Sequence, residues 1–277
     1  MSANEMVSGI GLRHVRVALR DTDGTIAVPA GTATATAYSG LQISGATALT
    51  LTVPDAVRIP VPGDDRVFYT WLLPPTENKT AELRVNKKDH NIIELITGTL
   101  QWGSPNRRKI AFNTDKQGEE PELVLWACRQ VIEADETLAA FGTKKWETYY
   151  IPNCLAYPKP PGMEYQTIGQ MTYSVQLNDA SITELGQTLT VVLNGCTRLE
   201  LIEIVTDKKF MLDAWIGDNV ETVFNMSQTP YETGVFNVTI DGVVQTLTTD
   251  YTRVAGALTF IATPASGAKI ICEYEYE

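Results

Sequence analysis

The residues that could carry acid–base, nucleophilic or metal chemistry are few and far apart. The chain has two histidines, His14 and His90, and neither has a partner at the spacing that metal ligands need. The sequence contains no nucleophile elbow, no glycine loop of the kind that cradles phosphate, and no zinc-protease motif. We therefore predict no catalytic residue, no metal ligand and no cofactor, and we expect that the protein is not an enzyme.

The cysteines support the same conclusion. They are too widely spaced for a zinc knuckle or a redox pair and too few for a disulfide scaffold. We expect buried thiols in a reducing compartment. The four are Cys128, Cys154, Cys196 and Cys272.

Clustered carboxylates are the remaining candidates for chemistry. Asp21 and Asp23 precede Gly24 as in the first residues of an EF-hand loop, but the twelfth position is Thr32 where that loop needs glutamate. The pairs Asp64-Asp65 and Glu119-Glu120 fall in turn-like contexts beside glycine. A catalytic carboxylate pair is one interpretation of them, and a solvated loop is the favoured one.

Composition excludes several classes of protein. The chain has 277 residues, of which 44% are hydrophobic, so it can bury a sizeable core and is not disordered. Its net charge of −11 argues against a general nucleic-acid binder, which needs clustered lysine and arginine. No stretch is long and apolar enough to span a membrane, and the first residues lack a secretion signal. We expect a soluble protein made in the cytoplasm.

The elements that must position these residues are mainly strands. Short segments rich in β-branched and aromatic residues alternate with turn residues throughout the chain. In 171–177 every second residue is apolar, which predicts a sheet with one covered face. The expected strands are 12–19, 66–73, 122–129, 148–157, 169–177, 189–193, 199–205, 208–216, 235–240 and 243–247.

Two stretches have helical character. Residues 86–98 carry an apolar stripe that Asn86 or Asp89 could cap and that Gly98 could end. A short helical turn is also expected within 131–141, although its type is left open. Asp241-Gly242 predicts a tight hairpin turn.

Residues 27–63 differ from the rest because they contain few charges and many small residues. We interpret them as a long loop or an extended hairpin with little core of its own. Its apolar side chains would not stay in water, so we expect a partner to order it. A second unit is expected from residue 181 onward, with a compact β-sandwich core over about 207–277.

The order of segments over 1–180 resembles that of the major tail tube proteins of long-tailed bacteriophages. The resemblance rests on the opening strand at 12–19, on TVPDAVRIPVPGDDRVFYTWLLPPTE (52–77) and on ELRVNKKDHNIIELITGT (82–99). It continues in YYIPNCLAYPKPPG (149–162) and QMTYSVQLND (170–179). The run DGVVQTLTTDYTRVAGALTFIATPASGAKI (241–270) is similar to the immunoglobulin-like domains appended to many phage structural proteins.

This resemblance implies a tail-tube-type β-sandwich or barrel with one flanking helix (1–180) and a small Ig-like decoration domain (181–277). It implies a virion structural protein whose hexameric rings stack into a tube that conducts DNA from capsid to host cell. Its partners would be further copies of itself and other tail proteins such as the tape measure, terminator and distal tail proteins. Double-stranded DNA would pass without specific binding, no membrane would be bound, and assembly would occur in the host cytoplasm.

The resemblance also suggests roles for particular residues. Some acidic side chains would line the lumen, where negative charge keeps the DNA polyanion loosely held; solubility on the outside is the alternative. These are Asp64, Asp65, Glu82, Asp89, Glu119 and Glu122. An adjacent ring would cover the apolar loop residues Leu41, Ile43, Leu49, Leu51 and Val53. The C-terminal domain would project outward and be dispensable for assembly, with a binding face made by Tyr231, Tyr251, Tyr274 and Tyr276, unless these tyrosines pack the sandwich core.

Three other classes remain as alternatives. Another phage structural component, either a capsid decoration protein or a tail terminator, shares the β-rich architecture. A bacterial surface adhesin would need an export signal. A polysaccharide-active enzyme would need paired carboxylates beside aromatic platforms.

Overall fold

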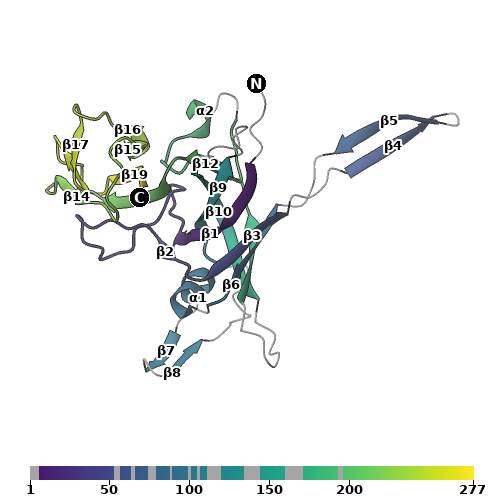
Figure 1. The fold of residues 1–277 in the computed structure, drawn as a ribbon, viewed down its shortest axis with the longest axis horizontal. Helices are drawn as coiled ribbons and strands as arrows, with labels where there is room; N and C mark the ends of the chain where they lie inside the picture. Colours follow the sequence, from purple (N-terminus) through teal and green to yellow (C-terminus); the bar gives the residue numbers. More distant parts are fainter. Residues whose placement is uncertain are drawn as a thin grey trace, which may run out of the picture.

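The protein is mainly β, as predicted, and its strands are grouped around one large antiparallel sheet (Figure 1). The structure, a computed structural model, describes residues 6–52, 57–63, 66–73, 79–87, 89–98, 101–104, 107–110, 120–133, 144–159, 171–192 and 196–277. The strands of the large sheet follow the order β2-β1-β9-β10-β11-β6-β3, and β12 pairs with β10. Their bounds are β1 (Met6–Leu19), β2 (Leu41–Gln42), β3 (Ala46–Thr52), β6 (Thr80–Val85), β9 (Leu123–Glu133), β10 (Lys144–Lys159), β11 (Met171–Leu177) and β12 (Ile202–Thr206).

Strand β11 shows why these residues form this sheet. Its burial alternates along the whole strand, because successive side chains of a strand point to opposite faces. Met171, Tyr173, Val175 and Leu177 are buried, while the intervening residues are partly exposed. The buried side chains join one core with apolar residues of β1, β6, β9 and β10. The predicted one-sided strand is confirmed.

Helix α1 (His90–Thr97) packs on this first core. Asp89 caps it, accepting a hydrogen bond from the Asn91 amide at 3.0 Å. Gly98 ends the helix at φ +61°, a left-handed conformation that glycine adopts without strain. The predicted helix, its cap and its stop are confirmed.

The C-terminal residues form a two-sheet antiparallel sandwich. One sheet has the order β13-β19-β15-β16 and the other has the order β14-β18-β17. The predicted turn at Asp241 (φ +49°) and Gly242 (φ +78°) joins β15 to β16. The bounds are β13 (Lys209–Ile216), β14 (Val223–Asn225), β15 (Phe236–Ile240), β16 (Val243–Val244), β17 (Tyr251–Val254), β18 (Ala257–Phe260) and β19 (Lys269–Tyr276).

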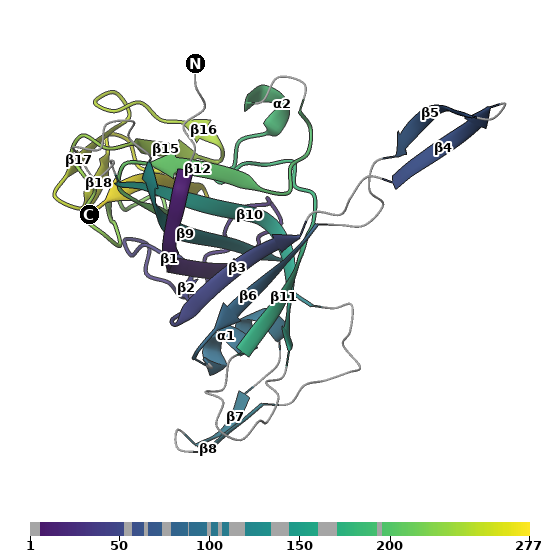
Figure 2. The ribbon, with the colours of Figure 1, turned by 45° about the vertical axis from the view of Figure 1, so that its right-hand side comes forward.

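The sandwich packs directly on the large sheet. A second core joins apolar side chains from the other face of the large sheet, such as Trp126 and Tyr150, to Leu212 of β13 and Ile271 of β19. A third core fills the sandwich itself. The sheet that contains β13 and β19 is therefore the middle layer of three, as the views in Figures 1 and 2 agree. Removing residues 207–277 would expose this apolar face, which argues against a dispensable appendage.

The segment 27–63 is not one long loop. It contains β2, β3 and β4 (Val57–Gly63), of which the first two belong to the large sheet. The part before β2 crosses the edge of the sandwich. Tyr38 exchanges backbone hydrogen bonds with Ala214 of β13, and the Asn225 amide of β14 donates to the Ala35 carbonyl. Residues 33–38 thus contact both sheets of the sandwich.

Two hairpins form small sheets of their own. Strands β4 and β5 (Arg66–Leu73) pair with each other, as do β7 (Gln101–Ser104) and β8 (Arg107–Ile110). The predicted strand 66–73 matches β5. Figures 1 and 2 both show the β4–β5 hairpin standing clear of the large sheet.

One local prediction needs correction. Residues 189–193 were expected as a strand, but α2 (Leu189–Val192) is a short helix. Residues 131–133 continue β9, and 134–141 lie outside the described residues, so the helical turn expected within 131–141 stays a prediction. The sandwich strands begin at Lys209, close to the expected start of the sandwich core at about 207, while β12 in the preceding residues pairs with β10 in the large sheet.

Candidate functional site

The acidic residues proposed for a lumen have local structural roles where they are described. Glu82 lies 3.4 Å from the Arg84 guanidinium, and Glu122 is paired with Arg20. Asp89 is the helix cap described above. Asp64, Asp65 and Glu119 lie outside the described residues.

The apolar residues proposed for an inter-ring loop belong to strands of the large sheet or lie beside them. Ile43 is buried, and Leu41, Leu49 and Leu51 are partly buried against the first core. The chain thus covers part of their surface, and cover by an adjacent ring stays a prediction. Val53 lies outside the described residues.

Most of the tyrosines proposed for a binding face are in the core. Tyr251, Tyr274 and Tyr276 are at most 7% exposed, so the sandwich-core alternative is correct for these three. The Tyr274 hydroxyl donates to Asp213 Oδ2 at 2.8 Å. Tyr231 is partly buried, and the Lys208 ammonium lies 4.5 Å from its ring centroid.

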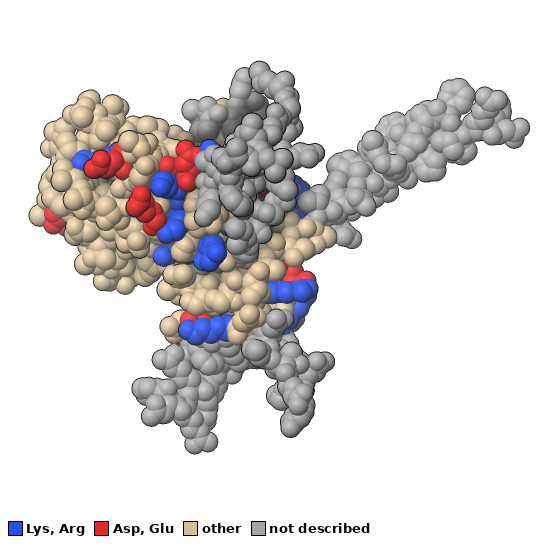
Figure 3. All heavy atoms as spheres, in the orientation of Figure 1, with Lys and Arg blue, Asp and Glu red and all other residues tan. Residues whose placement is uncertain are grey.

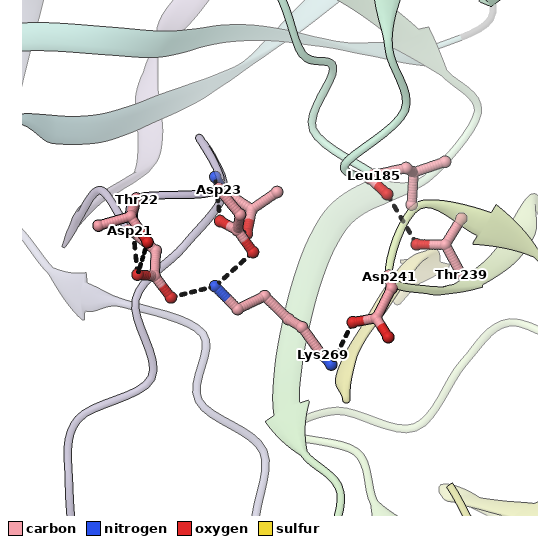
Figure 4. Close-up of polar contacts among 8 residues, drawn as sticks. Asp21, Thr22, Asp23, Leu185, Thr239, Asp241 and Lys269 are labelled. Atoms are coloured by element: carbon pink, nitrogen blue, oxygen red, sulfur yellow. Dashed lines mark hydrogen bonds and ion pairs between the residues drawn. The ribbon is translucent and has the colours of Figure 1, made fainter. Parts of the chain in front are cut away.

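The most polar arrangement that the sequence did not predict lies where the sandwich meets the large sheet. We call it the junction: the turn at Asp21–Thr25, the turn at Thr183–Gly186, Lys269 and the Asp241-Gly242 turn (Figure 4). Lys269 is 6% exposed, and its ammonium pairs with Asp21 and, at 2.8 Å, with Asp23. Its backbone amide donates to Asp241 Oδ1 at 2.8 Å. One lysine thus ties the first turn of the chain to the last strand.

A turn from the middle of the chain completes the junction. The Thr239 hydroxyl of β15 donates to the Leu185 carbonyl at 2.7 Å, and Leu185 packs in the second core. The backbones of Gly186 and Gly242 approach closely: a Cβ on Gly242 would lie 2.4 Å from the Gly186 oxygen. We call Thr183–Gly186 the wedge turn, because it contacts the sandwich and the large sheet together.

An open cavity of about 290 Å³ lies at the junction. Its lining carries both signs of charge and exposed backbone at two glycines. The lining residues are Asp23, Thr25, Ile182, Gly186, Asp241, Gly242, Lys269 and Ile271.

Burial and pairing set the charges at the junction. Burial alone would raise the pKa of Asp21, but hydrogen bonds from Lys269 and from the Thr22 amide lower it overall. Burial, followed by the charge of Glu273, raises the pKa of Glu184 to about 7. The wedge turn therefore carries a carboxyl that titrates near neutral pH.

A second polar network lies on β9 and β10, on the face that is turned away from the second core. The Glu147 carboxylate accepts from Arg129 Nε and from the Tyr149 hydroxyl, and Arg129 also donates to that hydroxyl at 3.2 Å. Burial and the bond to Glu147 raise the pKa of Tyr149 to about 12. These groups neutralise one another and leave no free nucleophile in the network.

The His14 ring packs among aromatic side chains. Its ring lies 6.2 Å from that of Trp146 and 6.3 Å from that of Tyr276. Burial, and then the positive charges of Lys209, Arg16 and Arg13, lower its pKa. The side chain of His90 lies outside the description, and only its place as the first residue of α1 is given.

Neither of the two comparisons with known proteins found a relative. No protein-family model matches the chain, and no curated protein matches it. Within the described ranges, no group of three or more His, Cys, Asp or Glu side chains could hold a metal ion. No helix in that part of the chain is long and apolar enough to cross a bilayer.

The sequence gives little local signal for the junction. In 269–276 (KIICEYEY) one alternating set is apolar or aromatic throughout, while the other combines Ile271 with Lys269, Glu273 and Glu275, so the pattern by itself indicates one covered face. Asp21 and Asp23 were examined as calcium ligands and rejected, but a distant lysine was not considered as their partner.

Proposed function

We propose that the protein is a viral structural subunit, the major tail tube protein of a long-tailed bacteriophage. Its rings of six copies would stack into a tube that conducts DNA from the capsid. The order of segments over 1–180 supports this proposal, and so does the second, sandwich-like unit. Other tail proteins would be its remaining partners, and its place would be the tail of the virion.

The observation that carries the proposal is an unpaired strand that leads into a free hairpin. Strand β3 pairs with β6 on one side, and no described strand pairs with its other side, although part of β1 lies near it. An exposed strand edge is a template for another strand, so soluble proteins cover or interrupt such edges. Repeated head-to-tail contacts between identical copies would cover every such edge in a closed ring.

The β4–β5 hairpin supports the same conclusion. A two-stranded hairpin is marginally stable alone in water. Among the described strands, β4 and β5 pair only with each other. A neighbouring copy would supply the surface that stabilises them.

Charge is compatible with a conduit. The net charge of −11 would keep DNA from binding tightly to the bore. On the face in Figure 3, acidic and basic side chains of the described residues are interspersed, and no single-sign patch suited to binding DNA covers it. An acidic lumen remains part of the proposal.

Electron microscopy of the purified protein tests the proposal. We expect hollow cylinders of uniform diameter whose length grows with protein concentration. A variant in which residues 57–73 are replaced by a short Gly-Ser linker should stay folded and monomeric by circular dichroism and sedimentation, because the hairpin pairs with no other described strand. Closed rings without tubes would favour a tail terminator, and a monodisperse monomer at every concentration would contradict both.

A further inference from the structure

The wedge turn places a carboxyl group inside the junction without a full set of partners. Glu184 Oε2 is buried, and no hydrogen-bond donor contacts it. The residues on either side are fixed, because Thr183 is 5% exposed and Leu185 is 6% exposed within the second core. Glu184 is partly exposed as a residue, but its Oε2 atom stays out of contact with solvent while the wedge turn keeps its contacts. A buried carboxylate with an unsatisfied oxygen is much less stable than the protonated acid in the same place.

Glu184 has ionisable neighbours from other parts of the chain. From β19, Glu273 adds negative charge. From β10, the buried Tyr150 hydroxyl also lacks a partner, and both Glu184 and Arg20 influence its titration. These neighbours do not supply a cation for Glu184.

The cations close to this region already have partners. Arg20 is paired through its NH1 group with Glu122, while its buried Nε has no hydrogen-bond partner. Lys269 is paired with Asp21 and Asp23. An ionised Glu184 would therefore face a second carboxyl, that of Glu273, without a compensating positive charge of its own.

We propose that the junction is a pH-sensitive contact, closed while Glu184 is protonated and loosened when Glu184 ionises and the wedge turn leaves its place between the sandwich and the large sheet. The inference concerns contacts within one chain and does not rest on the assembly proposed above. The raised pKa of Glu184, about 7, places the transition near neutral pH.

The sign of the effect follows from linkage. The folded pKa of Glu184 is raised above the ordinary value of 4.5, so its stabilising effect is complete below pH 4.5 and is lost as the pH rises to about 7. The junction is therefore expected to be tightest at acidic pH and to loosen as the pH rises toward 7.

Hydrogen–deuterium exchange of the full chain, corrected for the intrinsic effect of pH, tests the proposal. Between pH 5.5 and pH 8, the opening constant reported by peptides covering 182–188 and 236–244 should rise by roughly tenfold. Peptides from β11 should not change, because no part of that strand lies in the junction. A change of less than about twofold in the wild-type chain would overturn the proposal without reference to any variant.

Two variants assign the effect to Glu184. In Glu184→Gln, an uncharged side chain of the same shape, the junction peptides should stay protected across the whole pH range. Glu232→Gln is the matched control, because Glu232 is exposed on the sandwich, and it should behave as the wild type. If Glu184→Gln keeps the wild-type pH dependence, Glu184 is not the switch and the proposal is wrong.

Discussion

Strands β11 and β19 are of similar length and have opposite surroundings. In β11 every second side chain is buried, while in β19 all eight residues are buried. The difference arises from layers: β11 has a core on one face, and β19 lies between the core of the sandwich and the core shared with the large sheet. A strand in the middle layer holds two parts of the molecule together, so its side chains should matter on both faces.

The largest expected effect is a loss of stability when a side chain on either face of β19 is truncated. Ile270 faces the sandwich core and Ile271 faces the large sheet, and both are at most 2% exposed. Truncating either to alanine should lower the free energy of unfolding by about 2–4 kcal/mol, because each leaves a cavity. In β11, Thr172→Ala faces away from the core and should cost less than about 1 kcal/mol.

Urea denaturation followed by tryptophan fluorescence measures all three variants. If Ile271→Ala lowers the free energy of unfolding as little as Thr172→Ala does, the face of β19 that carries Ile271 does not pack in a core. The two units would then be connected more loosely than their packing indicates.

A smaller effect is expected where the Asp241-Gly242 turn meets the wedge turn. Gly242→Ala would place a Cβ 2.4 Å from the Gly186 oxygen and would also strain a residue at φ +78°. Gly267→Ala is the matched control, because Gly267 has φ +83° but has open space where the Cβ would lie. We expect about 1 kcal/mol for the control, from backbone strain alone, and clearly more for Gly242→Ala. Equal losses in thermal denaturation would mean that the two turns are not in contact.

The smallest expected effect concerns the cap of α1, the helix that packs on the same core as β11. Asp89→Ala removes the cap of α1, which packs on the core that β11 shares. Loss of an N-cap costs about 1 kcal/mol. Hydrogen exchange should increase in the first turn of α1 and stay unchanged in β13 and β19. A change in those strands would show that the two cores are coupled more tightly than the layers suggest.

The sequence predicted the parts of the fold that depend on local chemistry. The alternation in β11, the Asp89 cap, the Gly98 stop and the Asp241-Gly242 turn each follow from the preferences of a few adjacent residues. They were recognised because no distant part of the chain decides them.

Features that depend on distant residues were missed. Leu49 and Leu51 were interpreted as an apolar loop, because the strand that pairs with β3 is separated from it by the β4–β5 hairpin. The buried tyrosines of β19 were left open between surface and core, since nothing local reveals a layer packed on each side. The partnership of Lys269 with Asp21 crosses almost the whole chain.

That partnership has a consequence for biosynthesis. Asp21 leaves the ribosome long before its lysine, which is 248 residues further along. At about 5–20 residues per second, roughly 12 to 50 seconds separate the synthesis of the two. Until β13 and β19 have both been made, the face of the large sheet that packs on the sandwich lacks most of its cover, and nascent chains on one polysome carry the same bare surface side by side. A ribosome that stalls between these strands would therefore hold a chain that is prone to aggregate.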